Sequence, residues 1–307
     1  MTATLPRPES GSFVMNLVRA LRPAQWSKNV IVLAAFFFAL GDRSLSGLTP
    51  ELGLRALASA FFFCLVSSGV YLVNDLGDIA ADRLHPLKCR RPIAAGLIAP
   101  PVAWGLAVAL FAVGIGGGLL LNIRVGVALS AYVVLQLVYT AWLKRIALVD
   151  VMVIAAGFVL RAITGAVAVA VPISPWLLLC TFLLALFLGL CKRRHEKILL
   201  DDTAEQHRAV LEKYNPLLLD QLIAIVSACT ILAYSIYTLW PDTIEKFGSR
   251  HLGLTIPFVI FGVFRYLDLV YRHGKGGQPE QILLSDGPLL VAIALFGATV
   301  LAVIGLG

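Results

Sequence analysis

Charged residues are scarce in this chain. Only 14% of its 307 residues are Asp, Glu, Lys or Arg, whereas a soluble domain of this size carries about a quarter. The five cysteines are scattered without a C-x-x-C pair, and the five histidines lack the spacing of metal ligands. These shortages argue against a soluble domain, a disulfide framework and a zinc site. No cleaved signal peptide is visible, and the polar, proline-rich residues 1–12 predict a disordered tail.

Long apolar runs occupy most of the remaining chain, since 59% of all residues are hydrophobic. Nine stretches approach the length that crosses a bilayer. We therefore predict an all-α, polytopic membrane protein, with residues 13–307 forming a single domain of nine transmembrane helices. These helices are expected to enclose a central cavity that opens to the cytoplasm and to the bilayer. The predicted spans are residues 29–41, 54–73, 102–121, 124–143, 146–171, 174–191, 217–240, 252–270 and 288–306.

Lysine and arginine are distributed unevenly between the two sides of these spans. Eighteen fall on the side of the N-terminus and five on the other side. The positive-inside rule makes the cation-rich side cytoplasmic, in a plasma (inner) membrane. Basic loops of this kind face phospholipid headgroups and solvent, so the net charge of +7 predicts contact with membrane phospholipid and no nucleic-acid partner. The sequence allows a homo-oligomer and does not decide between it and a monomer.

A polar segment, "NDLGDIAADRLHPLKCRRPIAAG", begins at residue 74, where the second span should reach the membrane surface. On a helix, Asn74, Asp75, Asp78 and Asp82 fall within about 100° of one another and so share one face. Their oxygens suit Mg²⁺, which favours hard ligands and often bridges to phosphates. Asn74, Asp78 and Asp82 are the predicted metal ligands, with Asp75 in or near the ligand shell. The alternative is a solvated helix end whose carboxylates pair with nearby cations: Arg83, Lys88, Arg90 and Arg91.

A second polar cluster, "LGLCKRRHEKILLDD", ends the sixth span. Lys192-Arg193-x-x-Glu196 repeats the spacing of Asn74-Asp75-x-x-Asp78, which indicates an internal duplication. Leu200 stands where Asp82 stands in the first copy. One carboxylate and two cations on this face suit anionic reactants better than a second metal. The alternative is an ordinary basic cytoplasmic loop.

Arg161 lies within the fifth span, where a charge is costly and normally faces the bundle interior. We expect it to hold a substrate phosphate or to pair with a carboxylate of the metal cluster, and a purely structural ion pair with Asp150 or Glu196 is the alternative. Lys28 and Lys144 are either substrate ligands or cations that extend to the membrane surface. In the loop at 265–288, the residues Arg265, Glu280 and Asp286 are candidates for substrate contact, with a solvated loop as the alternative.

The motif N-D-x-x-D-x-x-x-D at this position resembles the first aspartate-rich motif of the UbiA superfamily of intramembrane prenyltransferases. The resemblance extends to "RPAQWSKN" at 22–29, "YTAWLKR" at 139–145 and "FVLRAITGA" at 158–166. Three patterns in this chain resemble motifs of the branch that transfers phosphoribose to a polyprenyl phosphate. These patterns are RPxQWxKN, HPxKxxRPIAAG and KRxxE. Prenyl-transferring members have a second aspartate-rich motif where this chain has Lys192, Arg193 and Leu200, and this departure argues against a prenyl diphosphate donor.

The resemblance implies Mg²⁺-dependent transfer of 5-phosphoribose from phosphoribosyl diphosphate to decaprenyl phosphate or a similar polyprenyl phosphate, for cell-wall precursor synthesis. The implied catalytic residues are Asp78, Asp82, Lys192, Arg193 and Glu196. The implied substrate-binding residues are Lys28, Asp75, Arg83, Lys88, Arg91, Tyr139, Lys144 and Arg161. Two alternatives are a UbiA-type prenyltransferase acting on an aromatic or glycerol-phosphate acceptor, and a transporter, whose charges would lie nearer the bilayer midplane.

Overall fold

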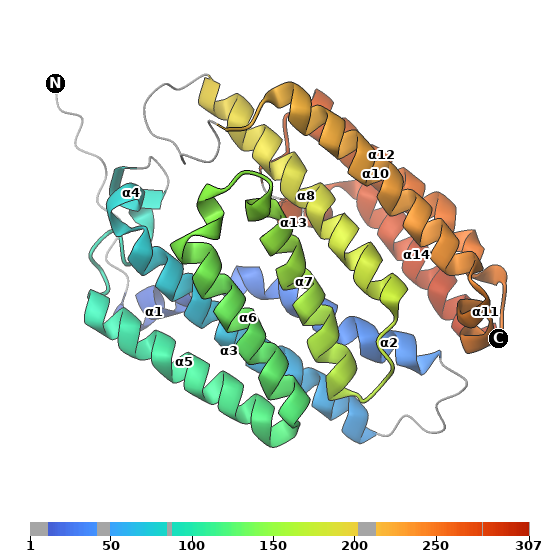
Figure 1. The fold of residues 1–307 in the computed structure, drawn as a ribbon, viewed down its shortest axis with the longest axis horizontal. Coiled ribbons are helices and arrows are strands. Elements are labelled where there is room, and N and C mark those ends of the chain that lie inside the picture. Colours follow the sequence, from blue (N-terminus) through green and yellow to red (C-terminus); the bar gives the residue numbers. More distant parts are fainter. Residues whose placement is uncertain (1–11, 42–49, 85–87, 202–212, 278, 307) are drawn as a thin grey trace.

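The described part of the chain is built from helices alone. A computed structural model describes residues 12–41, 50–84, 88–201, 213–277 and 279–306, and Figure 1 shows its ribbon. The elements are α1 (Phe13–Leu21), η1 (Pro23–Leu33), α2 (Ala34–Leu40), α3 (Pro50–Gly77), α4 (Ile79–Leu84), η2 (Lys88–Arg90), α5 (Pro100–Leu121), α6 (Ile123–Ala141), η3 (Leu143–Arg145), α7 (Val149–Ala168), α8 (Pro175–Asp201), α10 (Pro216–Leu239), α11 (Pro241–Phe247), η4 (His251–Thr255), α12 (Ile256–Arg272), α13 (Pro279–Ser285) and α14 (Gly287–Leu306).

The predicted class and span number agree with this structure. Within the described residues, eight helical segments are long and apolar enough to cross a membrane, and the shorter apolar helix Gly287–Val303 makes a ninth. Each matches a predicted apolar stretch. The all-α, polytopic prediction is therefore confirmed. Of the predicted N-terminal tail, residues 1–11 lie outside the described part, and Ser12 caps α1 by accepting a hydrogen bond from the Met15 N–H.

The first span begins earlier than the predicted range of 29–41. It runs from Phe13 to Leu40 through α1, η1 and α2, with a turn at Arg22, whose φ of 54° is unusual for a residue other than glycine. The sequence obscured this span because polar side chains interrupt its first half. Three of the cations counted on the cytoplasmic side, Arg19, Arg22 and Lys28, consequently lie inside it.

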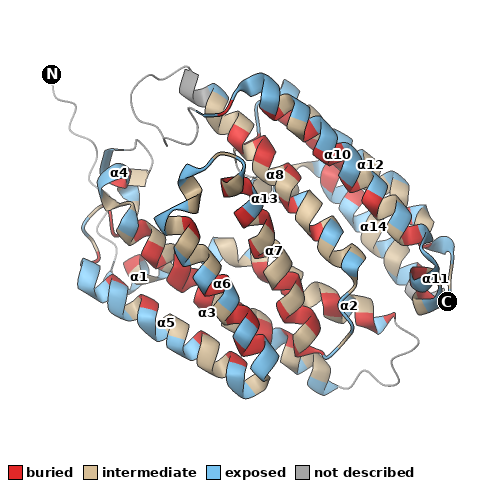
Figure 2. Ribbon diagram, in the orientation of Figure 1, coloured by how far each residue is buried: buried red, intermediate tan, exposed pale blue. Residues whose placement is uncertain are grey.

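The spans form two groups with a core in each (Figure 1). Helices α3, α5, α6 and α7 pack together, and α8 with α10, α12 and α14 make the other group, joined through the contact of α7 with α8. One core centres on residues such as Phe63 and Leu129, and the other on Phe187 and Leu219. Figure 2 shows buried residues along the inner faces and exposed residues along α5, α10 and α12, as expected of helices that face lipid.

The first span crosses behind α7 and approaches it closely. A Cβ atom on Gly165 would lie 1.8 Å from the Val32 carbonyl oxygen, so any larger residue would force the two segments apart. Small residues at such crossings let membrane helices pack backbone to backbone. This contact brings η1, with Asn29, against the middle of α7, where Arg161 lies.

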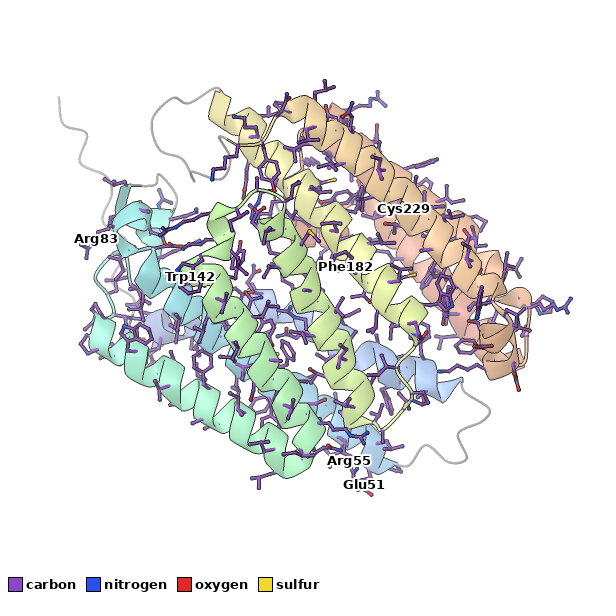
Figure 3. The ribbon with its side chains drawn as sticks, in the orientation of Figure 1. Glu51, Arg55, Arg83, Trp142, Phe182 and Cys229 are labelled. Atoms are coloured by element: carbon purple, nitrogen blue, oxygen red, sulfur yellow. The ribbon has the colours of Figure 1, made fainter. Side chains whose placement is uncertain are left out.

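The two ends of the bundle differ in their side chains. Figure 3 shows Arg83 and Trp142 at the end where α4 lies, and Glu51 and Arg55 at the opposite end. A cavity of about 790 Å³ lies at the opposite end, between η4 and α14, and is lined in part by Arg250, His251 and Thr299. None of the predicted site residues lines that cavity. The predicted site residues other than Arg161 and Lys28 belong to the α4 end, which we call the mouth.

Candidate functional site

The first polar cluster at the mouth is a set of carboxylates held by arginines. Asp75, at the end of α3, is 2% exposed and accepts from Arg22 Nη2 at 2.5 Å. Arg91 Nη1 donates to Asp75 Oδ1 at 3.1 Å and to Asp82 Oδ2 at 2.7 Å, so one nitrogen links the two carboxylates. Arg22 also lies over the ring of Tyr71, with 5.0 Å from Cζ to the ring centroid. The arginines compensate the charge of two buried aspartates that would otherwise be costly.

The remaining members of this cluster are bonded to the end of α6 and to η3. Lys144 Nζ donates to Asp78 Oδ1 at 2.6 Å, and the Thr140 hydroxyl donates to Asn74 Oδ1. Although α3 ends at Gly77, the Asp78 N–H donates to the Asn74 carbonyl at 3.0 Å and the Asp82 N–H to the Asp78 carbonyl at 2.8 Å. The four-residue repeat of Asn74, Asp78 and Asp82 therefore continues across the helix break.

The residues of this cluster fit Mg²⁺ in donor chemistry. They offer amide and carboxylate oxygens only, which is the ligand set that Mg²⁺ prefers. In the part of the chain that the structure describes, no three His, Cys, Asp or Glu side chains gather closely enough to hold a metal ion. Arg91 and Lys144 bind the oxygens of Asp82 and Asp78 instead. The assignment of Asn74, Asp78 and Asp82 as metal ligands therefore stays a prediction.

The second polar cluster centres on Arg193, which is 2% exposed. Arg193 Nε donates to Asp150 Oδ2 at 2.7 Å, and Nη1 donates to Glu196 Oε2 at 2.5 Å. The fully buried Asp150 also accepts from the Tyr214 hydroxyl at 2.6 Å. Asp150 lies in the first turn of α7, Arg193 and Glu196 lie on α8, and Tyr214 precedes α10. The expected proximity of Arg193 and Glu196 is confirmed.

The end of α6, the turn η3 and the first residues of α7 connect the two clusters. The Thr140 hydroxyl contacts Asn74, and the adjacent Tyr139 is buried. Lys144 reaches Asp78, and Asp150, six positions later, holds Arg193. The two polar segments of the sequence, about 120 residues apart, are therefore neighbours at one end of the bundle, as a site for two reactants requires.

Arg161 lies apart from both clusters. Its side chain donates from Nε to Asn29 Oδ1 (2.8 Å), from Nη1 to the Gly157 carbonyl (2.9 Å) and from Nη2 to the Tyr132 hydroxyl (3.0 Å). The rings of Phe63, Tyr132 and Phe158 surround its guanidinium at 4.9–5.0 Å. The alternative of an ion pair with Asp150 or Glu196 is wrong, because Arg193 bonds both of these carboxylates and neither contacts Arg161.

The other predicted cations have varied surroundings. Arg83 is exposed, and its Nε donates to the Ala94 carbonyl at 3.1 Å, so it braces the loop after α4. Lys28, Lys88 and Lys192 are partly buried. Of the three candidates in the loop at 265–288, Arg265 and Asp286 bind one another through two hydrogen bonds, of 3.1 and 2.8 Å, and the side chain of Glu280 lies outside the described part.

Three residues of these clusters are absent from the set of site residues predicted from the sequence: Arg22, Asp150 and Tyr214. Arg22 is the first residue of the motif at 22–29, which was a usable signal. Asp150 is a lone acidic residue at the start of an apolar span, which was a usable signal. The prediction from sequence names it only as an alternative ion-pair partner of Arg161. Tyr214 had no signal in its spacing, since its role depends on a contact with a residue 64 positions away.

Comparisons with known proteins agree with this geometry. Residues 29–276 match the model of the UbiA prenyltransferase family. The chain is 37% identical to the decaprenyl-phosphate phosphoribosyltransferase of Corynebacterium glutamicum, over 94% of this chain and 86% of that protein. It is 35% identical to the protein of the same name from Mycobacterium tuberculosis, over 96% of each chain. A UbiA homolog from Archaeoglobus fulgidus bound to GPP and Mg²⁺ has the same fold, with a TM-score of 0.70, 21% identity and coverage of 94% of this chain and 99% of that one. This chain therefore belongs to the UbiA prenyltransferase family.

Proposed function

We propose that the protein transfers 5-phosphoribose from phosphoribosyl diphosphate to a polyprenyl phosphate such as decaprenyl phosphate, with release of diphosphate. The observation that carries this proposal is the similarity to decaprenyl-phosphate phosphoribosyltransferases over nearly the full chain. The product would supply precursors of the arabinan type for the cell wall. Both reactants are anionic, which agrees with a mouth that combines lysines and arginines with the carboxylates.

In this proposal, the first cluster receives the diphosphate of the donor. Asn74, Asp78 and Asp82 would hold Mg²⁺, with Asp75 beside them, as the donor chemistry of these residues allows. When bound, Mg²⁺ neutralises charge on the departing diphosphate. Arg91 keeps Asp75 and Asp82 next to each other, which fixes two oxygens before the donor arrives.

The second cluster receives further phosphate groups and the sugar. Lys192 and Arg193 bind phosphate, and Glu196 orients a ribose hydroxyl. The acceptor is already an anion at neutral pH, so the transfer needs no strong general base. Leu200 stands in place of a carboxylate, and the two acids of this cluster, Asp150 and Glu196, are both bonded to Arg193, which disfavours a second metal. The further substrate-binding residues that we propose are Lys28, Arg83, Lys88, Tyr139 and Lys144. For Arg161, whose guanidinium is bonded to Asn29, Gly157 and Tyr132, we propose a structural role instead.

The orientation that we propose places the mouth in the cytoplasm, with the protein in the plasma membrane. The sugar donor is water-soluble and enters from the cytosol, whereas the polyprenyl acceptor enters sideways from the bilayer. The excess of lysine and arginine on the side of the mouth supports this orientation. We also propose that the protein can associate into homo-oligomers.

A direct assay tests the reaction. Purified protein is incubated with radiolabelled phosphoribosyl diphosphate, decaprenyl phosphate and MgCl₂, and label is measured in the lipid phase. We expect lipid-linked phosphoribose. The charge-removing variant Arg55→Met, at the opposite end of the bundle, serves as a control and should be fully active. Prenylation of an aromatic or glycerol-phosphate acceptor, with no label entering the polyprenyl phosphate, would establish the alternative function instead.

A further inference from the structure

Two adjacent arginines on α8 have partners of the same kind. Each donates from Nε to an aspartate, and each aspartate also accepts from a tyrosine hydroxyl. In the first set, Arg193 and Tyr214 bind Asp150 at 2.7 and 2.6 Å. In the second set, Arg194 and Tyr271 bind Asp220 at 2.5 and 2.8 Å. The sets therefore differ in position and burial rather than in chemistry.

Burial separates the two sets. The side chains of Asp150 and Arg193 are 0% and 3% exposed, whereas those of Asp220 and Arg194 are 36% and 16% exposed. An exposed ion pair contributes little to stability. A buried pair must have well-placed partners for both charges, and removing a partner is costly. The geometry around Asp150 is therefore much more tightly constrained.

The hydrogen bonds of Tyr214 have a defined direction. Its hydroxyl accepts from the Leu148 N–H at 2.7 Å and donates to Asp150 Oδ1. Burial and the bond to Asp150 raise the pKa of Tyr214 well above its ordinary value, so the hydroxyl stays protonated and remains a donor. Leu148 has a φ of 68°, a strained conformation for a residue other than glycine, and its N–H is bonded to this hydroxyl.

These bonds determine how Arg193 is oriented. A guanidinium is planar and rigid, so a bond to Nε fixes the plane in which both Nη groups lie. Nη1 then reaches Glu196, and Nη2 donates to none of the residues that the structure describes. Nη2 thus remains available beside Glu196 as a charged donor for a phosphate oxygen.

We propose that Asp150 and Tyr214 are positioning residues that fix the guanidinium of Arg193 so that its Nη groups bind a phosphate of one of the two reactants. This inference rests on the proposed function, in which Arg193 holds phosphate. Asp150 and Tyr214 do not touch the reactants themselves. The phosphate belongs either to the sugar donor or to the lipid acceptor, and the two sources are separated by the test.

Tyr214→Phe and Tyr271→Phe form a matched pair, because each removes one hydroxyl that donates to an aspartate. The KM for phosphoribosyl diphosphate and the KM for decaprenyl phosphate are measured separately, together with kcat per monodisperse protein. We expect Tyr214→Phe to raise one of the two KM values by about tenfold, as for loss of an oriented charged hydrogen bond. Tyr271→Phe should leave both KM values within about twofold of wild type. The reactant whose KM rises is the one that Arg193 holds.

Equal effects of the two variants would overturn the inference. A fall in kcat with both KM values unchanged would also overturn it, because a merely structural role reduces the amount of active protein. The Arg193→Lys background adds a second check. If Tyr214 acts through Arg193, Tyr214→Phe should then change KM by less than about twofold, since lysine has no planar group to orient. A persistent tenfold rise would contradict the proposal.

Direct binding separates this inference from the proposed function. The Kd of phosphoribosyl diphosphate and that of decaprenyl phosphate are measured calorimetrically without turnover. A rise of about tenfold for one ligand in Tyr214→Phe, and not in Tyr271→Phe, supports the positioning role. Equal Kd values in both variants refute it. Absence of lipid-linked phosphoribose from the wild-type protein refutes the proposed function independently of these values.

Discussion

Lys144 Nζ lies 2.6 Å from Asp78 Oδ1, although the two residues are 66 positions apart in the chain. The ammonium occupies one oxygen of the carboxylate that we propose as a Mg²⁺ ligand. If Asp78 holds Mg²⁺, the ion and Lys144 would have to share this carboxylate. The side chain of Asp78 is 30% exposed, whereas those of Asp75 and Asp82 are 3% and 4% exposed, so Asp78 is the carboxylate of the cluster that a soluble ion reaches most directly.

The first prediction concerns the metal. Asp78→Asn keeps the size of the side chain but removes the charge that would hold Mg²⁺, so we expect turnover to fall by about a hundredfold or more while the protein still folds. Chelation with EDTA should abolish wild-type activity. Asp220→Asn is the control, because Asp220 also pairs with a cation, Arg194, but lies outside the proposed site. Full activity of Asp78→Asn in EDTA would refute the metal assignment.

The second prediction concerns orientation. In a variant whose five cysteines are replaced, single cysteines are introduced at Ala99, before α5, and at Ser249, between α11 and η4. The positive-inside rule predicts that Cys at 99 resists a membrane-impermeant thiol reagent in intact cells and reacts after permeabilisation. Cys at 249 should react from outside. A third position, Ala204, belongs to the same cytoplasmic prediction but lies outside the described residues. Labelling in the reverse order would invert the topology.

The third prediction concerns Arg161. It lies eleven positions after Asp150 in α7, which places it about 16 Å from Asp150 along the helix axis. Arg161→Lys keeps the charge but places all its donors on one nitrogen, which cannot reach the three acceptors that the three guanidinium nitrogens reach, so we expect the melting temperature in detergent to fall by about 5 °C. The KM for phosphoribosyl diphosphate should not change. Arg55→Lys, at an exposed ion pair, should leave the melting temperature unchanged. A raised KM with normal stability would instead support direct contact with the donor.

The fourth prediction concerns pH. Hydrogen bonds from Arg265 lower the pKa of Asp286 below its ordinary value, and Asp286 also accepts from the Leu289 N–H at the start of α14. A carboxyl whose pKa is lower in the folded state stabilises that state above about pH 3.9, and the stabilisation is lost as pH falls through the lowered value. Asp286→Asn should therefore lower the melting temperature at neutral pH. The difference from wild type should shrink below about pH 4. A constant difference would show that the charge plays no part.

The positions of the spans were predictable because the bilayer imposes a length and a polarity on them. The first span was the exception. Asn16, Arg19 and Arg22 made its first half read as polar, although Asn16 is buried and Arg22 is turned toward Asp75. A side chain that finds its partner elsewhere in the fold looks like an interruption when only the sequence is read.

Sequence spacing predicted those neighbours that successive helical turns connect. Backbone hydrogen bonds link Asn74, Asp78 and Asp82 across the break after α3, and one turn of α8 places Arg193 beside Glu196. The partners of these residues come from other elements, and spacing along one helix carries no information about them. Asp150 illustrates this limit, since its bond to Arg193 depends on how α7 packs against α8.

The surroundings of Arg161 have a consequence for ion permeability. Its positive charge is accompanied by amide, carbonyl, hydroxyl and aromatic groups, and by no carboxylate within the described residues. The local potential therefore stays positive deep in the bundle, where a low dielectric constant strengthens it. Hydronium or sodium ions that entered from a wet mouth would be repelled there. A fixed arginine in this place lets an enzyme admit water from one side of a membrane without becoming a proton leak.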